Sequence, residues 1–321
     1  RNSANYFDIK INKMKNFIYL LGLLLTVSIN AQLPGSGVSL QSNVLDGVYI
    51  QEHIPTKRVV QYTHLREADV MWSKRIWRVI DLREKMNHKL LYPLEKLTDR
   101  MCLFDVIRYG ALQEGAITVY SPEDDRFTFP VKPSNGNIND PEFKQELNKM
   151  FSREVKVKQF DPETGEPLTD ADGQEIVLDT IEFLENRDIV KYEIKEDWFF
   201  DKQRSQLDVR IIGISPIIYL TEENAETGVP EVIGLKNLFW LYFPECRYTF
   251  QNFYVYNPNN DAQKMSFDDL FWKREFSSSI KKESNVFDRK IAPNNSGLDA
   301  LLESERIKND MFNFEHDLWH F

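Results

Sequence analysis

The chain has 321 residues, 42% of them hydrophobic and 28% charged, which is typical of a globular protein with one large domain or two small ones. Its formal net charge of −10 disfavours contact with a phosphate backbone, so nucleic-acid binding is not expected. Aromatic residues make up 13% of the chain, and some are expected at protein interfaces, where Tyr, Trp and Phe are enriched.

The N-terminal stretch has the three parts of a secretory signal peptide. A basic start at Met14 precedes the apolar run 17–27, which is too short to cross a bilayer, and Ala31 provides a small residue for cleavage. We therefore interpret residues 14–31 as a signal peptide and residues 1–13 as lying upstream of the true start. The alternative is a buried apolar helix. No Cys follows the expected cleavage site, so we do not expect a lipid anchor.

Residues 32–60 are predicted to form an extended N-terminal arm. The sequence Leu33-Pro-Gly-Ser-Gly37 is typical of a flexible linker, and the short apolar patch 44–50 follows it. Such an arm could wrap its own domain or add to a neighbouring subunit.

Residues 61–151 are expected to form a first α+β unit. Its predicted elements are a strand over 74–82 with bulky residues on both faces, a helix over 98–115 capped by Thr98 or Asp99, a hairpin of strands 117–120 and 127–129, and a helix over 141–151 capped by Asp140.

Residues 152–187 are interpreted as an acidic hairpin region inserted between two larger units, with turns at 161–167 and 170–173. Asp170, Asp172 and Glu175 hint at calcium, but the third acidic position and the distant Glu of a calcium loop are missing. A solvated turn is therefore the favoured interpretation.

Residues 188–321 are expected to form a second α+β unit with a C-terminal helix. Ile189–Ile194 alternates as a strand. The charged aromatic stretch around Trp198 is predicted as a turn or short helix that leads into a buried strand over 207–214, which ends near Gly213 and Pro216. A strand with this many apolar residues is usually central in a sheet.

Further elements are predicted along the rest of this unit. They are an acidic loop over 221–229, a helix over 244–256, a helix that starts at Ser266 with a carboxylate at Asp269, a polar edge strand over 277–283, and an amphipathic helix over 298–321 with Leu298, Leu301, Leu302, Ile307, Met311 and Phe314 as its apolar residues. The predicted fold class is α+β, with mixed sheets and flanking helices. Short internal similarities raise the option of two related strand–helix–hairpin units.

Few residues suggest chemistry. His316 and His320 stand one helical turn apart, which is half of a zinc site, but Asp317 occupies the place where the metalloprotease pattern needs Glu. An exposed helix end is the favoured interpretation. No phosphate-binding glycine loop or nucleophile motif is present, so we predict no catalytic residue, cofactor or metal. Cys102 and Cys246 could form a disulfide or remain two buried thiols.

Three stretches of the chain resemble the GldN/PorN family. Lys195-Glu-Asp-Trp-Phe-Phe-Asp-Lys-Gln-Arg-Ser205, followed by Asp208-Val-Arg-Ile-Ile-Gly-Ile-Ser-Pro216, is similar to the signature of that family. Trp72-Ser-Lys-Arg-Ile-Trp-Arg-Val-Ile-Asp-Leu-Arg-Glu84 resembles its N-terminal half, and Phe239-Trp-Leu-Tyr-Phe-Pro-Glu-Cys-Arg247 its second half. The resemblance covers roughly residues 44–290.

The resemblance implies a non-enzymatic periplasmic subunit of the type IX secretion and gliding machinery, peripherally associated with the outer membrane. Its implied partners are a GldK/PorK-like lipoprotein, copies of itself in a ring, and a GldL–GldM-like (PorL–PorM-like) motor, with membrane contact only through these partners. Candidate contact residues are Tyr49, Trp72, Trp77, Trp198, Phe199, Phe200, Trp240 and Tyr242. The alternatives are a periplasmic hydrolase with a C-terminal zinc site and a monomeric periplasmic binding module.

Overall fold

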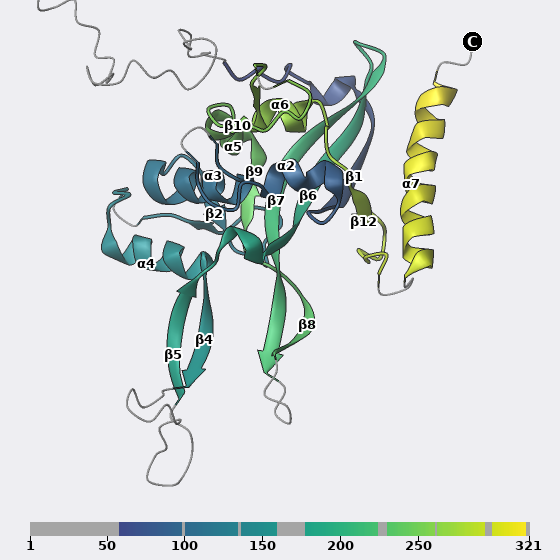
Figure 1. Cartoon of the computed structure of the whole chain (residues 1–321). Coiled ribbons are helices and arrows are strands. Elements are labelled where there is room, and N and C mark those ends of the chain that lie inside the picture. The colour runs from purple at the N-terminus through teal and green to yellow at the C-terminus, as the bar shows by residue number, and fades with distance from the viewer. Residues whose placement is uncertain are drawn as a thin grey trace, which may run out of the picture. The chain divides into compact units, whose positions relative to one another are not determined.

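An eight-stranded antiparallel sheet organises the chain (Figure 1). The computed structural model describes residues 58–97, 100–133, 136–158, 177–223, 230–260, 262–292 and 297–318. The predicted signal peptide, nearly all of the predicted arm with Tyr49, the turns at 161–167 and 170–173, and His320 lie outside the described residues.

The strands follow one another in the order β12 (Ser279–Glu283), β1 (Val70–Asp81), β6 (Ile189–Asp201), β7 (Gln206–Glu223), β9 (Trp240–Tyr242), β2 (Val119–Tyr120) and β3 (Pro130–Val131), and β8 (Pro230–Asn237) also pairs with β7. This sheet with its flanking helices confirms the predicted α+β class. Strands from residues 61–151 and from residues 188–321 are hydrogen-bonded in the same sheet, and Lys57–Phe321 forms one compact unit.

Strand β1 has bulky side chains covered on both of its faces, as predicted for this stretch. Ile76 and Ile80 are fully buried on one face, and Trp77 is 7% exposed on the other. The strand begins at Val70, a few residues before the predicted start. Within the sheet, β1 lies between β12 and β6.

The prediction of a turn or short helix around Trp198 was wrong. Strand β6 continues through this stretch to Asp201, where Trp198 pairs with Lys74 of β1 and Val209 of β7. Charged residues are tolerated in the strand because their partners lie on neighbouring elements. The bidentate pair between Arg75 and Asp197, at 2.6 and 2.7 Å, is one example.

The predicted end of the next strand near Pro216 was also wrong, because β7 runs on to Glu223. Pro216 has no N–H to donate, but its carbonyl accepts a hydrogen bond of 3.0 Å from the Leu238 backbone. Gly213 lies in the same strand where no side chain would fit, because an added Cβ would stand 2.5 Å from the Phe127 ring. The strand is central in the sheet, as its apolar sequence predicted.

The helical elements are η1 (Glu67–Asp69), η2 (Lys85–Asn87), α2 (His88–Leu91), α3 (Leu103–Tyr109), the π-helical turn η3 (Gly110–Glu114), α4 (Pro141–Met150), η4 (Asn186–Asp188), α5 (Phe243–Phe250), α6 (Phe267–Trp272) and α7 (Leu298–Asp317). Three predictions from capping signals are confirmed: Asp140 caps α4, Ser266 and Asp269 form a capping box on α6, and Gly115 ends η3 with φ of 63°.

Helix α3 begins later than predicted. Its N-cap is Cys102, whose Sγ accepts a hydrogen bond of 3.4 Å from the Asp105 backbone, so the helix starts at Leu103. The predicted caps Thr98 and Asp99 lie outside the described residues. Helix α5 is shorter than predicted, because it ends at Phe250 and is followed by the small pair β10 (Tyr254–Val255) and β11 (Met265–Ser266).

Two hairpins are present where they were predicted, but the bounds of one differ. Strands β2 and β3 pair antiparallel, yet β3 is Pro130–Val131, and the predicted strand 127–129 is not a strand. Strands β4 (Ser152–Lys158) and β5 (Val177–Phe183) form a separate two-stranded sheet in the predicted insertion.

The main core lies between one face of the sheet and the helices α3, α5 and α6. It contains residues of β1, β6, β7 and β9 together with a group of phenylalanines from the helices, which are Phe243, Phe250, Phe267 and Phe271. Helix α7 packs on the same face nearer the edge strand β12, where Ile76, Ile280, Ile307 and Met311 form a smaller cluster. On the opposite face, Trp77, Tyr120 and Trp240 form a third cluster.

Candidate functional site

Helix α7 has apolar residues on two opposite faces, whereas a single apolar stripe was predicted. Ile307 and Met311 are 2% and 5% exposed against the sheet, but Leu298 and Leu301 are 70% and 57% exposed. The separation explains the difference, because Leu298 precedes Ile307 by about two and a half helical turns and so points the opposite way. One face of α7 therefore holds the helix on the sheet, and the other is open.

The loop before the helix also carries exposed apolar side chains. Val286 and Phe287 are 96% and 75% exposed, and a shallow hollow of about 360 Å³ connects this loop with Glu303 and Arg306 of α7. We call this region the helix surface and define it by Val286, Phe287, Leu298, Leu301 and Leu302. Exposed apolar patches of this kind mark sites of protein interaction.

A second exposed apolar region lies on the ribbon formed by β7 and β8. Along β7, pairing with β6 ends at Ile218. Strands β7 and β8 therefore continue as a two-stranded ribbon beyond the body of the sheet (Figure 1). Tyr219 faces Leu235 directly across this ribbon, and the two are 39% and 51% exposed. We call this region the ribbon surface and define it by Tyr219, Leu220, Val232, Ile233 and Leu235. An open strand edge beside exposed apolar residues is a template for pairing with another chain.

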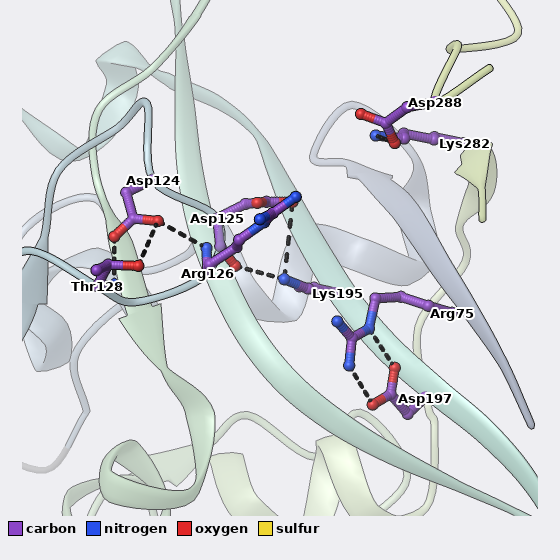
Figure 2. A network of polar contacts seen from close by, with 9 residues as sticks. All are labelled: Arg75, Asp124, Asp125, Arg126, Thr128, Lys195, Asp197, Lys282 and Asp288. Carbon is purple, nitrogen blue, oxygen red and sulfur yellow. Dashed lines mark hydrogen bonds and ion pairs between the residues drawn. The ribbon is translucent and has the colours of Figure 1, made fainter. Parts of the chain in front are cut away.

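A charged hollow of about 370 Å³ lies on the sheet face that carries Trp77. Figure 2 shows polar contacts among residues in and around it. Lys195 lies at its base, 2% exposed, and donates a hydrogen bond to the Asp125 carbonyl. Its Nζ also lies 5.6 Å from the Trp77 ring and 5.5 Å from the Phe127 ring. Burial lowers the pKa of Lys195, and Asp125 offsets part of that effect.

Two further ion pairs border the charged hollow. Arg75 pairs with Asp197, and Lys282 pairs with Asp288 at 2.5 Å. The hydrogen bond from Lys282 lowers the pKa of Asp288. These contacts fasten two loops, one around Asp125 and one around Asp288, over the sheet. The lining carboxylates are paired with lining cations, and this arrangement suits the anchoring of loops.

The predicted contact residues are mostly packed inside the chain. Trp72 stacks on Phe314 of α7 at 4.6 Å between ring centroids, and Trp198 packs in the same cluster, so both help to hold α7. Trp77, Phe199 and Trp240 are 7%, 5% and 3% exposed.

Phe200 and Tyr242 are half-buried, and Tyr49 lies outside the described residues. Sequence reasoning concentrated on aromatic motifs and missed the exposed aliphatic residues of the helix and ribbon surfaces. The angular spacing of Leu298 and Ile307 was the signal available for the helix surface.

Cys102 and Cys246 are buried free thiols in the structure. Burial raises the pKa of the Cys102 thiol to about 12, and burial also raises the pKa of Cys246. Because the thiolate is the reactive form, both should be chemically inert in the folded protein.

We expect a thiol reagent such as 5,5′-dithiobis(2-nitrobenzoate) at pH 8 to label neither cysteine of the folded chain and both in denaturant. A pKa of about 12 instead of 9.0 lowers the thiolate population of Cys102 at this pH by roughly a thousandfold. The release of nitrothiobenzoate, followed by absorbance, counts the reactive thiols. Rapid labelling under native conditions, or no labelling in denaturant because a disulfide is present, would contradict this expectation.

The predicted half zinc site is only partly described. His316 lies at the exposed end of α7, 3.9 Å from an oxygen of Asp317, and His320 lies outside the described residues. Within the described ranges, no group of three or more His, Cys, Asp or Glu residues is arranged to hold a metal ion. None of the helices in those ranges is both long and apolar enough to span a membrane.

Comparison with known proteins gives one informative match. No curated protein matches the chain. The family model described as "Gliding motility associated protein GldN" matches residues 65–320, which include every strand of the eight-stranded sheet and helix α7. The chain therefore belongs to the GldN family, whose members are components of the gliding-motility and type IX secretion machinery.

Proposed function

We propose that this chain is a non-enzymatic structural subunit in the periplasm, peripherally associated with the outer membrane. In this proposal it forms a ring with copies of itself and with a GldK/PorK-like lipoprotein, and the ring meets a GldL–GldM-like motor. Family membership supports a role in gliding and secretion. The exposed helix and ribbon surfaces support a role that depends on protein contacts.

The observation that carries the proposal is the presence of two different apolar surfaces on one chain. The helix surface lies near β12 at one edge of the sheet, and the ribbon surface lies on β7 and β8. Two unlike surfaces allow head-to-tail contacts, which close into a ring when the rotation between subunits permits it. They also allow one surface to bind a neighbouring copy while the other binds the lipoprotein.

The proposal is tested by co-purification of the chain with the lipoprotein from a membrane extract, followed by light scattering. We expect a large assembly that contains both proteins. Two double variants probe the surfaces: Phe287→Ser with Leu301→Ser on the helix surface, and Tyr219→Ser with Leu235→Ser on the ribbon surface. Each should weaken at least one contact by about tenfold or more, because truncating central apolar anchors usually costs over 1 kcal/mol each.

Phe129→Ser is the matched control, because Phe129 is 69% exposed but lies outside both surfaces. It should leave the assembly intact. A chain that stays single at high concentration and does not co-purify with the lipoprotein would contradict the proposal and favour a monomeric binding module. Zinc that remains bound to the wild type but not to His316→Ala would instead favour the hydrolase.

A further inference from the structure

A groove of about 530 Å³ separates α7 from the segment that follows α6. Polar and large apolar side chains share its lining, and the apolar ones are Met86, Trp198, Leu207, Phe276, Met311 and Phe312. Phe312 and Met86 are 65% and 55% exposed. The groove lies on the sheet face that carries α7 and involves neither the helix surface nor the ribbon surface.

Two arginines in this groove share one carboxylate. Glu196 is fully buried, and its oxygens lie 3.2 Å from Arg78 Nε and 2.9 Å from Arg274 Nη2. The indole N–H of Trp198 also donates to Glu196, at 3.0 Å. The inner part of the groove therefore has one more positive than negative charge. On α7, Lys308 and Glu315 also line the groove, and Lys308 pairs with Glu305.

Arg78 has a buried donor that makes no hydrogen bond among the described residues. Its side chain is 8% exposed, and its Nε has no hydrogen-bond acceptor despite the ion pair with Glu196. Its Nη1 donates a long hydrogen bond of 3.5 Å to the Ser278 hydroxyl. Burial lowers the pKa of Arg78, and the nearby Arg274 adds to that effect, against the opposing influence of Glu196 and Glu305. A guanidinium has five donors, and leaving buried donors unpaired is costly.

We propose that this groove binds a short segment of a partner protein in which an Asp or Glu is flanked by large apolar side chains. The carboxylate would accept hydrogen bonds from the fork-shaped guanidinium groups of Arg78 and Arg274, which match its geometry. The flanking apolar side chains would contact Trp198 and Phe312. A ring of copies does not require this site, so the inference goes beyond the proposed function.

Isothermal titration calorimetry on the full chain tests the charge requirement with two blocked peptides. One probe is acetyl-Ser-Leu-Glu-Phe-Ser-amide, and the other has Gln in place of Glu. We expect the acidic peptide to bind at least about tenfold more tightly. In ¹H–¹⁵N spectra, the indole signal of Trp198, assigned with Trp198→Phe, should shift with the acidic peptide. Equal binding of the two peptides, or no binding up to millimolar concentration, would overturn the proposal.

Variants at the partly exposed rim keep the test independent of folding. Arg274→Gln and Phe312→Ser should each lower the affinity for the acidic peptide by about tenfold, while the circular dichroism spectrum of the chain remains unchanged. Leu301→Ser on the outer face of the same helix should not affect binding. If sodium acetate at equal concentration shifts the Trp198 signal as strongly, the site takes small anions and the peptide proposal is wrong. If these variants lose peptide binding but still co-purify with the lipoprotein, peptide binding and ring assembly depend on different sites.

Discussion

Replacing Arg247 by Met should lower the free energy of unfolding by about 3–5 kcal/mol, because the change leaves a carboxylate buried without its partner. Arg247 and Asp268 form a bidentate pair between α5 and α6 at 2.7 and 3.1 Å. Their side chains are 3% and 5% exposed. The guanidinium also lies 4.4 Å from the ring of Tyr62 and 5.1 Å from that of Trp272, and these contacts would be lost as well.

Urea unfolding followed by circular dichroism measures this effect. The double variant Arg247→Met with Asp268→Leu should recover much of the loss, because it removes both charges together. Arg306→Met is the matched control, since its pair with Asp310 has side chains 56% and 55% exposed, and it should cost no more than about 1 kcal/mol. If Arg247→Met and Arg306→Met lower the free energy of unfolding equally, the buried pair contributes no more to stability than the exposed one.

Phe250→Ala should destabilise the chain by about 3–5 kcal/mol through loss of buried contacts and the cavity left behind. Phe250 is fully buried at the centre of the phenylalanine group. Its ring centroid lies 6.0 Å from those of Phe243 and Phe271 and 6.3 Å from that of Phe267. Because these residues come from both α5 and α6, the substitution should loosen both helices on the sheet.

The midpoint of urea unfolding again provides the measurement. Phe250→Leu should cost clearly less than Phe250→Ala, because most of the buried volume is kept. Phe287→Ala removes the same ring from a position that is 75% exposed, and we expect a change within about 0.5 kcal/mol. A loss for Phe250→Ala as small as that for Phe287→Ala would mean that the core closes over the cavity.

Local signals predicted much of the secondary structure. Asp140 before Pro141 and Ser266 before Asp269 indicated helix starts, because their side chains accept backbone hydrogen bonds that only a helix start offers. The alternation around Ile76 and Trp77 indicated a strand covered on both faces. In each of these cases the deciding interactions lie within a few residues of sequence.

Predictions failed where distant residues decided the structure. Glu196 belongs to the charged stretch that was predicted as a turn or short helix, but it is buried in a strand where Arg78 and Arg274 contact it, and neither is near it in sequence. A single sequence gives no signal for such long-range contacts. The missed N-cap of α3 has a different cause, because Cys102 and Asp105 are only three residues apart. There the usual preference for Thr or Asp as N-cap favoured Thr98 and Asp99 over Cys102.

The surfaces were the least predictable part. Apolar residues such as Tyr219 and Leu235 have the same alternation whether or not another element covers them, so the pattern alone cannot tell an exposed ribbon from a buried one. The aromatic residues of the family motifs were predicted as contact residues, yet Trp77 and Trp240 are buried in a cluster with Tyr120.

The pairing of β1 with β12 has a consequence for how the chain reaches its final form. Ile76 pairs with Glu283, so an early strand acquires its outer neighbour only after nearly the whole polypeptide is available. Contacts between such remote segments slow folding, since a long loop must close before they form. A nascent chain would therefore expose Trp72 and Ile76 for most of its synthesis. We expect a holding chaperone to bind near these residues until β12 and α7 have been synthesised and pack against them.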